Sequence, residues 1–313
     1  MERDKTHNAH SFQNHLTKYI KTFKIVYNNN IIRRIVVMSI KIVADSSANL
    51  KTTPDNSLIS VPLTLRTDER EFVDNESLDT KEMTDYLASY KGKSGSACPS
   101  SQDWVDAFGD SEEIYAIAIT SNLSGSFNSL RIAKEQYEEE HPGRKVCIID
   151  SLSAGSELKL IVEKIQELHA EGKTFEEISK EIAAYQEHTH MVFCLKSLQN
   201  LANNGRVNPA VAKIAGVLNI HVVGIASAEG TLEQREKARG PKKALVAIDK
   251  VMKEFNYNGG KVFIDHCFNE TDALVLKNHI LETYPNADVR IAETRGLCSF
   301  YAEVGGLMIG YEG

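Results

Sequence analysis

Apolar runs of strand length alternate with helical patterns along the first half of this chain, and this alternation restricts its possible folds most strongly. Buried strands that alternate with helices form parallel sheets, in which each helix crosses over to the next strand. The sequence therefore predicts an α/β fold with an N-terminal parallel sheet and flanking helices. The strand-like runs are residues 40–44, 114–119 and 146–149, and the helical patterns include residues 78–90 and 127–137.

A further alternating run, residues 58–65, contains Pro62, which cannot donate a ladder hydrogen bond, so we expect it near a sheet edge. The length of 313 residues favours two domains. We predict an α/β domain at 39–188 and a second α/β domain at 189–313. Helical patterns at 157–170, 175–187, 209–218 and 241–255 accompany a second set of strands at 191–195, 220–225, 262–264 and 289–292.

Residues 1–38 differ in charge from the rest. Residues 1–37 contain seven Lys or Arg side chains and two acidic ones, whereas the whole chain has a formal net charge of −7. We expect residues 1–38 to be an N-terminal extension, with translation starting at Met38, immediately before the first strand. The alternative is a basic arm that binds a membrane surface.

The acidic balance argues against nucleic acid as a partner, because a nucleic-acid binder needs clustered Lys and Arg to neutralise phosphates. The five cysteines are widely spaced and form no CxxC pair, so we expect reduced thiols, a cytoplasmic location and no metal. The longest apolar run near the N-terminus, residues 35–38, is far shorter than the roughly 20 residues that span a bilayer. No transmembrane segment is expected.

Serine-rich loops follow the strands of the predicted parallel sheet, at residues 45–47, 120–126 and 150–153, and a fourth lies at 93–101. The C-terminal ends of parallel strands meet at one edge, where α/β proteins bind ligands and helix N-termini present free N–H groups. Gly125 lacks a Cβ and lets the backbone approach a ligand closely. The pattern predicts an anion site at Ser96, Ser124 and Gly125, whereas helix capping alone explains the other serines.

Two other functions use comparable loops. A nucleotide site is not indicated, because neither GxxxxGK[ST] nor GxGxxG follows a strand. A serine hydrolase needs a GxSxG elbow, a histidine and an acid, and the residue two before Ser124 is Asn122 instead of glycine. An acyl hydrolase with Ser124 as nucleophile and His266 as base stays an alternative, as does a small-anion sensor.

Two arginines lie in glycine-containing turns of the second half. Arg206 follows Gly205, and Arg239 precedes Gly240 within a basic stretch, residues 237–243, that we expect to open a helix. Solvated surface turns explain both. The alternative is that these arginines bind an acidic ligand headgroup or contact a partner protein that handles phosphate, because guanidinium groups pair well with carboxylates and phosphates.

Taken in order, several motifs resemble those of the DegV family of fatty acid-binding proteins over residues 39–313. No single motif is decisive, but their order across both predicted domains is specific. The matching segments are residues 42–50, 96–100 (where the family has a Thr-Ser-Gln-Pro loop), 123–127, 149–151, 198–207 (ending in Gly-Arg-Val), 237–245 and 305–311.

The resemblance implies a non-catalytic protein that binds a long-chain fatty acid and no other cofactor, with the acyl tail in a tunnel that the second domain completes. It places the carboxylate at Ser96, Ser124 and Gly125. Family arginines linked to the ligand site or the partner fall on Arg206 and Arg239. The implied partner is an ATP-dependent fatty acid kinase that phosphorylates the bound carboxylate for phospholipid synthesis.

The chain departs from the family pattern near its C-terminus, where Tyr301 stands in place of a histidine. A tyrosine hydroxyl also bonds a carboxylate, while Glu303 adds negative charge nearby. The resemblance thus places Tyr301 among the candidate contacts of the headgroup or the partner.

Overall fold

The computed structural model describes residues 40–215 and 219–313. The expected N-terminal extension lies outside these residues, and so do the expected translation start at Met38 and the alternative basic arm. The end of the helix expected at 209–218 also lies outside them. Residues 39–313 form one compact unit.

The first sheet has four parallel strands in the order β2-β1-β6-β7. Ile42 of the central strand β1 is paired with Leu58 on one side and with Tyr115 on the other. The predicted parallel sheet is confirmed, and the run that contains Pro62 contributes the edge strand β2. The strands are β1 (Ile40–Asp45), β2 (Leu58–Val61), β6 (Glu113–Ala118) and β7 (Lys145–Asp150).

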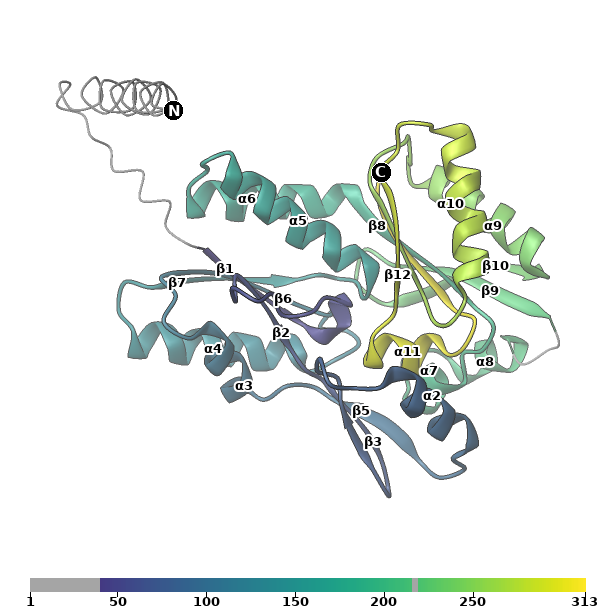
Figure 1. The fold of residues 1–313 in the computed structure, drawn as a ribbon, viewed down its shortest axis with the longest axis horizontal. Helices are drawn as coiled ribbons and strands as arrows, with labels where there is room; N and C mark the ends of the chain where they lie inside the picture. Colours follow the sequence, from purple (N-terminus) through teal and green to yellow (C-terminus); the bar gives the residue numbers. More distant parts are fainter. Residues whose placement is uncertain (1–39, 216–218) are drawn as a thin grey trace, which may run out of the picture. The chain divides into compact units, whose positions relative to one another are not determined.

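Helices cover both faces of this sheet (Figure 1). Ile42 and Ala44 pack in the cluster that contains α5 and α6, whereas Val43 packs against α3 and α4. Successive strand residues point to opposite faces, so a strand that is covered on both faces is apolar throughout. The helices are α3 (Ser101–Phe108), α4 (Ser126–Glu140), α5 (Ser156–Ala170) and α6 (Phe175–Tyr185).

A small antiparallel sheet in the order β4-β3-β5 follows β2 in the chain. The apolar run at residues 58–65 therefore divides at Pro62 into strands of two different sheets. Ser96 lies on β5, where it is paired with Leu65 of β3. The elements of this segment are η1 (Ser46–Ala48), β3 (Thr64–Thr67), β4 (Glu71–Val73), α2 (Thr80–Ser89) and β5 (Ser94–Ala97).

The second half forms a six-stranded sheet in the order β10-β9-β8-β13-β11-β12. Strands β11 and β12 are parallel, and the other neighbouring pairs are antiparallel. The strands are β8 (Thr189–Leu195), β9 (Ile220–Ala226), β10 (Leu232–Arg239), β11 (Val262–His266), β12 (Val289–Glu293) and β13 (Leu307–Glu312).

Strands β10 and β13 have no counterpart among the strands predicted from the sequence. β10 lies at a sheet edge and its sequence is dominated by charged residues, so it lacks an apolar signal. The basic stretch at 237–243 was expected to open a helix. The helix expected at 241–255 is confirmed as α9, which begins at Pro241, whereas the first three residues of the basic stretch end β10.

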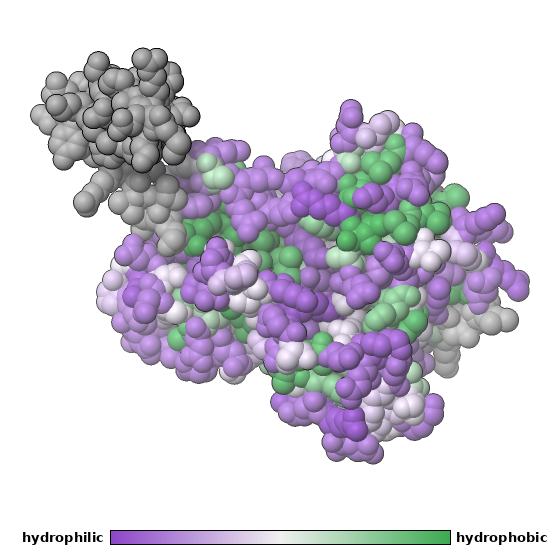
Figure 2. Space-filling model, in the orientation of Figure 1, coloured by the Kyte–Doolittle hydropathy of each residue, from purple (hydrophilic) through white to green (hydrophobic). Residues whose placement is uncertain are grey.

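Helices α9 and α10 pack together on one face of the second sheet (Figure 1). Figure 2 shows an apolar patch over α10, where Leu274 and Val275 are 45% and 46% exposed. On the opposite face lie α5, α11 and α7, together with a second apolar cluster. The helices of this half are α7 (Gln199–Asn203), α8 (Pro209–Ala215), α9 (Pro241–Glu254), α10 (Glu270–Thr283) and α11 (Gly296–Ala302), with a 3-10 turn, η2 (Gln186–His188).

The helix α5 joins the two halves, because it packs against β13 and β8 as well as against α6. Its buried Lys159 forms an ion pair with Asp265 of β11 at 2.6 Å, and Asn49 donates to the other carboxylate oxygen at 2.8 Å. The predicted domain boundary near residue 188 stays a prediction. Within the two described ranges, no helix combines the length and apolar character that crossing a bilayer requires.

Candidate functional site

A cavity lies on the face of the six-stranded sheet opposite α9 and α10. Its empty volume, which includes space open to solvent, is about 630 Å³. Its wall is mainly apolar, with polar side chains at Ser96, Ser124, Arg206 and Tyr301. The apolar lining is formed by Leu63, Ile119, Leu123, Ala154, Met191, Phe193, Leu195, Leu201, Leu232, Leu297, Cys298, Ala302 and Met308.

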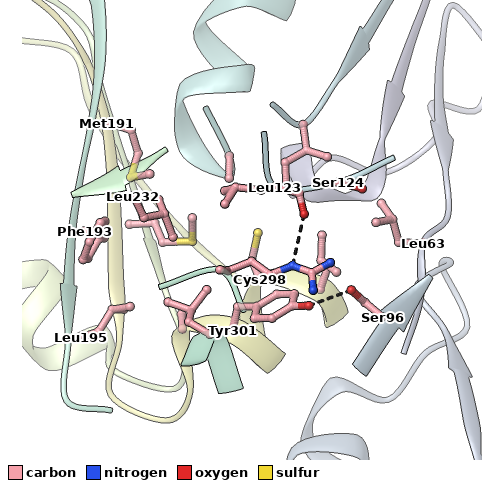
Figure 3. Close-up of a pocket in the computed structure, with 17 residues that line it drawn as sticks. Leu63, Ser96, Leu123, Ser124, Met191, Phe193, Leu195, Leu232, Cys298 and Tyr301 are labelled. Atoms are coloured by element: carbon pink, nitrogen blue, oxygen red, sulfur yellow. Dashed lines mark hydrogen bonds between the residues drawn. The ribbon is translucent and has the colours of Figure 1, made fainter. Parts of the chain in front are cut away.

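The polar side chains of the wall gather at one end of the cavity. Figure 3 shows Met191, Phe193 and Leu195 along strand β8, on the side of the cavity away from Ser96 and Ser124. This arrangement matches an amphipathic ligand with one polar end, because a polar head and an apolar tail each find a wall of their own kind.

The hydroxyls of Ser96 and Tyr301 meet at the polar end. The Oγ of Ser96 on β5 is 2.8 Å from the Oη of Tyr301 on α11, and either hydroxyl can donate (Figure 3). A hydroxyl donates one hydrogen bond and accepts two, so the pair keeps capacity for a further partner. The pair is therefore suited to bind a carboxylate oxygen.

Buried polar contacts fix the start of α11. Asp74 accepts hydrogen bonds from the N–H groups of Gly296 and Leu297, both at 2.9 Å. The Arg295 N–H donates to Asn49 Oδ1 at 2.8 Å, and its guanidinium donates to the Asp74 carbonyl oxygen at 2.9 Å. Burial raises the pKa of Asp74, against the hydrogen bond from Leu297 and the charge of Arg295. These contacts attach α11, with its cavity-lining side chains, to the first half of the chain.

Ser124 lies in the loop between β6 and α4, and its Oγ accepts a hydrogen bond from the Ser126 N–H at 3.2 Å. The Ser126 hydroxyl donates to the buried carboxylate of Asp45 at 2.7 Å, and the Ile119 N–H donates to the same oxygen at 3.0 Å. Burial raises the pKa of Asp45, against these hydrogen bonds. Asp45 thus holds the ends of β1 and β6 and the start of α4 together, which positions Ser124 at the cavity.

Arg206 follows the turn after α7, in which Gly205 has a φ of +72°. Its Nε donates to the Leu123 carbonyl oxygen at 3.2 Å, and its Nη1 donates to the Asn204 carbonyl oxygen. The side chain lines the cavity and brings a positive charge to it.

Two of the predicted site residues do not line the cavity. Gly125 is the exposed residue before α4, with a φ of −73° that any residue adopts, and a Cβ there would lie 3.3 Å from Cys98 Sγ. Arg239 is exposed at the end of β10, paired with Ile220. It stays a prediction that the Gly125 N–H binds a carboxylate. It also stays a prediction that Arg239 contacts a partner.

His266, the candidate base of the hydrolase alternative, is buried at the end of β11. Its Nδ1 accepts a hydrogen bond from the Asn269 N–H at 3.3 Å, so it orders the turn before α10. Among the described residues that line the cavity with Ser124, there is no histidine and no carboxylate. In the same ranges, no group of three or more His, Cys, Asp or Glu side chains is arranged to hold a metal ion.

Sequence reasoning missed Asp74 and most of the apolar wall. No local pattern marks Asp74, because its partners lie 222 and 223 residues later in the chain. Cys298 in the wall donates to the Ser47 carbonyl oxygen at 3.3 Å, and burial raises the pKa of its thiol well above the ordinary value. The protonated thiol is a weak nucleophile, so Cys298 serves as apolar lining.

The fold and cavity are those of an α/β protein that binds a small amphipathic molecule. The family model described as "Uncharacterised protein, DegV family" matches residues 39–312, and the chain belongs to the DegV family. The resemblance inferred from the sequence motifs is therefore confirmed.

Solved structures and curated relatives agree with this assignment. A DegV family protein from Eubacterium eligens, loaded with heptadecanoic acid, is 44% identical, with a TM-score of 0.85 over 87% of this chain and 99% of that chain. The Fatty Acid Kinase (Fak) B3 protein of Streptococcus pneumoniae, loaded with linoleic acid, is 43% identical, with a TM-score of 0.86 over 88% and 99%. A curated DegV domain-containing protein of Streptococcus pneumoniae is 43% identical over 88% of this chain and 99% of its own length.

Proposed function

We propose that this protein binds one long-chain fatty acid, with the carboxylate at Ser96, Ser124 and the Gly125 N–H and the acyl tail along the apolar wall. The observation that carries the proposal is the cavity itself, in which polar side chains gather at one end of a mainly apolar wall. Similar proteins from Eubacterium eligens and Streptococcus pneumoniae, loaded with heptadecanoic and linoleic acid, support the same class of ligand. Arg206 and Tyr301 are the additional headgroup contacts.

The tail supplies most of the affinity in this proposal. Burial of a methylene contributes about 0.8 kcal/mol, so a tail of some sixteen carbons contributes on the order of 10 kcal/mol before the loss of translational and rotational freedom. A hydrogen bond to a charged carboxylate contributes about 1.5 to 3 kcal/mol. The head therefore determines orientation more than strength.

We further propose that the protein is a cytoplasmic carrier and not an enzyme. A buried tail shields a sparingly soluble molecule, while the carboxylate stays at the polar end for a second protein. The partner we propose is an ATP-dependent fatty acid kinase that transfers a phosphoryl group to the carboxylate, with the exposed Arg239 as a partner contact. The name of the Streptococcus pneumoniae relative, which refers to a fatty acid kinase, supports this partner.

Two assays on the purified protein separate this proposal from the alternatives. In the first, fatty acid is added after removal of any bound lipid, and one acid should bind per chain, whereas a small-anion sensor binds inorganic phosphate and no fatty acid. In the second, a chromogenic acyl ester is added. The carrier leaves the ester intact, and turnover that disappears in Ser124→Ala would establish the hydrolase instead.

A further inference from the structure

Three residues form one cross-strand row of the second sheet, and two of them line the cavity. Met308 of β13 is paired with Phe193 of β8, and Phe193 is paired with Gly224 of β9. Met308 and Phe193 line the cavity. In Figure 3, Phe193 lies on the side away from Ser96 and Ser124, where the end of an acyl tail would lie under the proposed function.

The Phe193 ring lies in the space that Gly224 leaves open. A Cβ built on Gly224 would lie 2.2 Å from Phe193 Cζ and 2.7 Å from Cε2, far closer than atoms of a folded protein approach. The ring edge therefore lies against the backbone of β9, and any side chain at position 224 would push it away. Glycine across from an aromatic residue on a neighbouring strand is a known way to seat the ring on the sheet.

Met308 has a corresponding glycine. A Cβ on Gly155 would lie 2.5 Å from Met308 Cε and 3.1 Å from its Sδ, and Gly155 has a φ of +66°, which strains any other residue. The loop before α5 thus receives the end of the thioether side chain. The Ser156 hydroxyl also donates to the Met308 carbonyl oxygen at 2.8 Å, which holds the strand at this loop.

From this geometry we propose that Phe193, seated on Gly224, and Met308, seated on Gly155, form the far end of the acyl cavity and determine the length of the fatty acid that fits. This inference rests on the proposed function. A closely packed wall moves little to admit a longer tail, because protein interiors are as dense as organic crystals. Extra methylenes would force the neighbouring side chains out of their preferred rotamers. A tail that already reaches the ring therefore gains nothing from another methylene.

Truncation of the two wall residues provides the test. Phe193→Ala and Met308→Ala open the far end, and Phe193→Leu opens it less with a smaller risk to folding. Gly224→Ala is a poorer probe, because its Cβ would also meet the Glu233 carbonyl oxygen at 2.4 Å and disturb the pairing of β9 with β10. Phe108→Leu is the matched control, since Phe108 is buried in the cluster between α3, α4 and the first sheet.

Binding constants are measured for a series of saturated fatty acids that differ by two carbons, on the intact protein and each folded variant. In the truncation variants the preferred chain becomes longer. The affinity for an acid two carbons longer than the wild-type optimum, relative to that optimum, should rise on the order of tenfold, since each buried methylene contributes about fourfold. Phe108→Leu should keep the wild-type length profile.

The outcomes separate this inference from the function on which it rests. If the wild type binds the series but Phe193→Leu, Phe193→Ala and Met308→Ala weaken every acid by the same factor, the inference is wrong and the function stands. If the wild type binds no fatty acid of any length, both are wrong. A shift toward longer chains in the wall variants, without one in Phe108→Leu, supports the inference.

Discussion

The Tyr301 hydroxyl lies 2.8 Å from the Ser96 hydroxyl, although the two residues are 205 positions apart in the chain. The contact joins α11 of the second half to β5 of the small antiparallel sheet. The polar end of the cavity therefore forms only when both halves of the chain are folded together.

This contact predicts a measurable role for the Tyr301 hydroxyl. Tyr301→Phe should weaken fatty acid binding about tenfold or more, because a hydrogen bond to a carboxylate contributes about 1.5 to 3 kcal/mol. Isothermal titration with the delipidated protein measures the change. Ser96→Ala and the double variant complete a cycle, in which the two losses should not add, because the hydroxyls act as a pair.

Tyr86→Phe is the control for this cycle, since its hydroxyl lies outside the cavity and contacts Glu69 at 3.1 Å. It should bind with wild-type affinity. Wild-type affinity in Tyr301→Phe as well would remove Tyr301 from the headgroup site.

The carboxylate placement predicts different effects at two neighbouring positions. Ser124→Ala should weaken lipid retention modestly, because one hydroxyl is lost. Gly125→Val should abolish retention, because its side chain would press against Cys98 Sγ, 3.3 Å from the Cβ position, and displace the loop whose N–H we propose binds the carboxylate. The φ of −73° at Gly125 accepts valine, so the variant should fold, and circular dichroism checks this. Unchanged lipid content in folded Gly125→Val would contradict the placement.

Asp74 should stabilise the fold through α11. Asp74→Ala leaves Arg295 buried without its carboxylate and two N–H groups of α11 without their acceptor. The free energy of unfolding should fall by about 3–5 kcal/mol, as for other buried pairs that lose one member. Urea titration measures it. The matched control is Asp79→Ala, which removes the exposed cap of α2 and should lower stability by about 1 kcal/mol. Equal losses in the two variants would refute the special role of Asp74.

Glu157 should make stability depend on pH. Burial raises the pKa of Glu157 from 4.5 to about 7, although Thr189 donates a hydrogen bond to its carboxylate at 2.7 Å. Between these values the unfolded chain releases a proton that the folded chain keeps, so stability falls as pH rises from about 4.5 to about 7 and then stays level. The fall amounts to roughly 3 kcal/mol.

Glu157→Gln isolates this effect, because the amide still accepts from Thr189 but does not titrate. Urea titrations of both proteins across the pH window should show a stability difference that changes with pH up to neutrality. A constant difference over the window would mean that Glu157 has an ordinary pKa in the folded protein.

The parallel sheet was predictable because β1 is covered on both faces by helices, so that its apolar run carries a strong local signal. β10 could not be predicted, because a strand at an exposed sheet edge needs no apolar face. Its charged sequence is also typical of a solvent-exposed turn. β13 was also missed, although its run is buried, because it follows two glycines at the end of the chain.

Part of the site could be predicted for a similar reason. Ser124 lies in a loop after a recognisable strand, and Ser96 lies in a serine-rich segment that was expected to be a loop but forms β5. The family motifs name Arg206 and Tyr301, and all four side chains line the cavity. Phe193 and Met308 could not be assigned, because their role depends on cross-strand pairing with residues far away in the chain. Asp74 and Arg295 likewise act through tertiary contacts that no local spacing reveals.

Mass spectrometry of the purified protein, first native and then denatured, tests the central claim most directly. The account predicts a co-purifying mass that is released on denaturation, identified as a long-chain fatty acid at about one molecule per chain. A protein that purifies without lipid and takes up no added fatty acid would contradict it, and the change from histidine to Tyr301 would then indicate a different ligand.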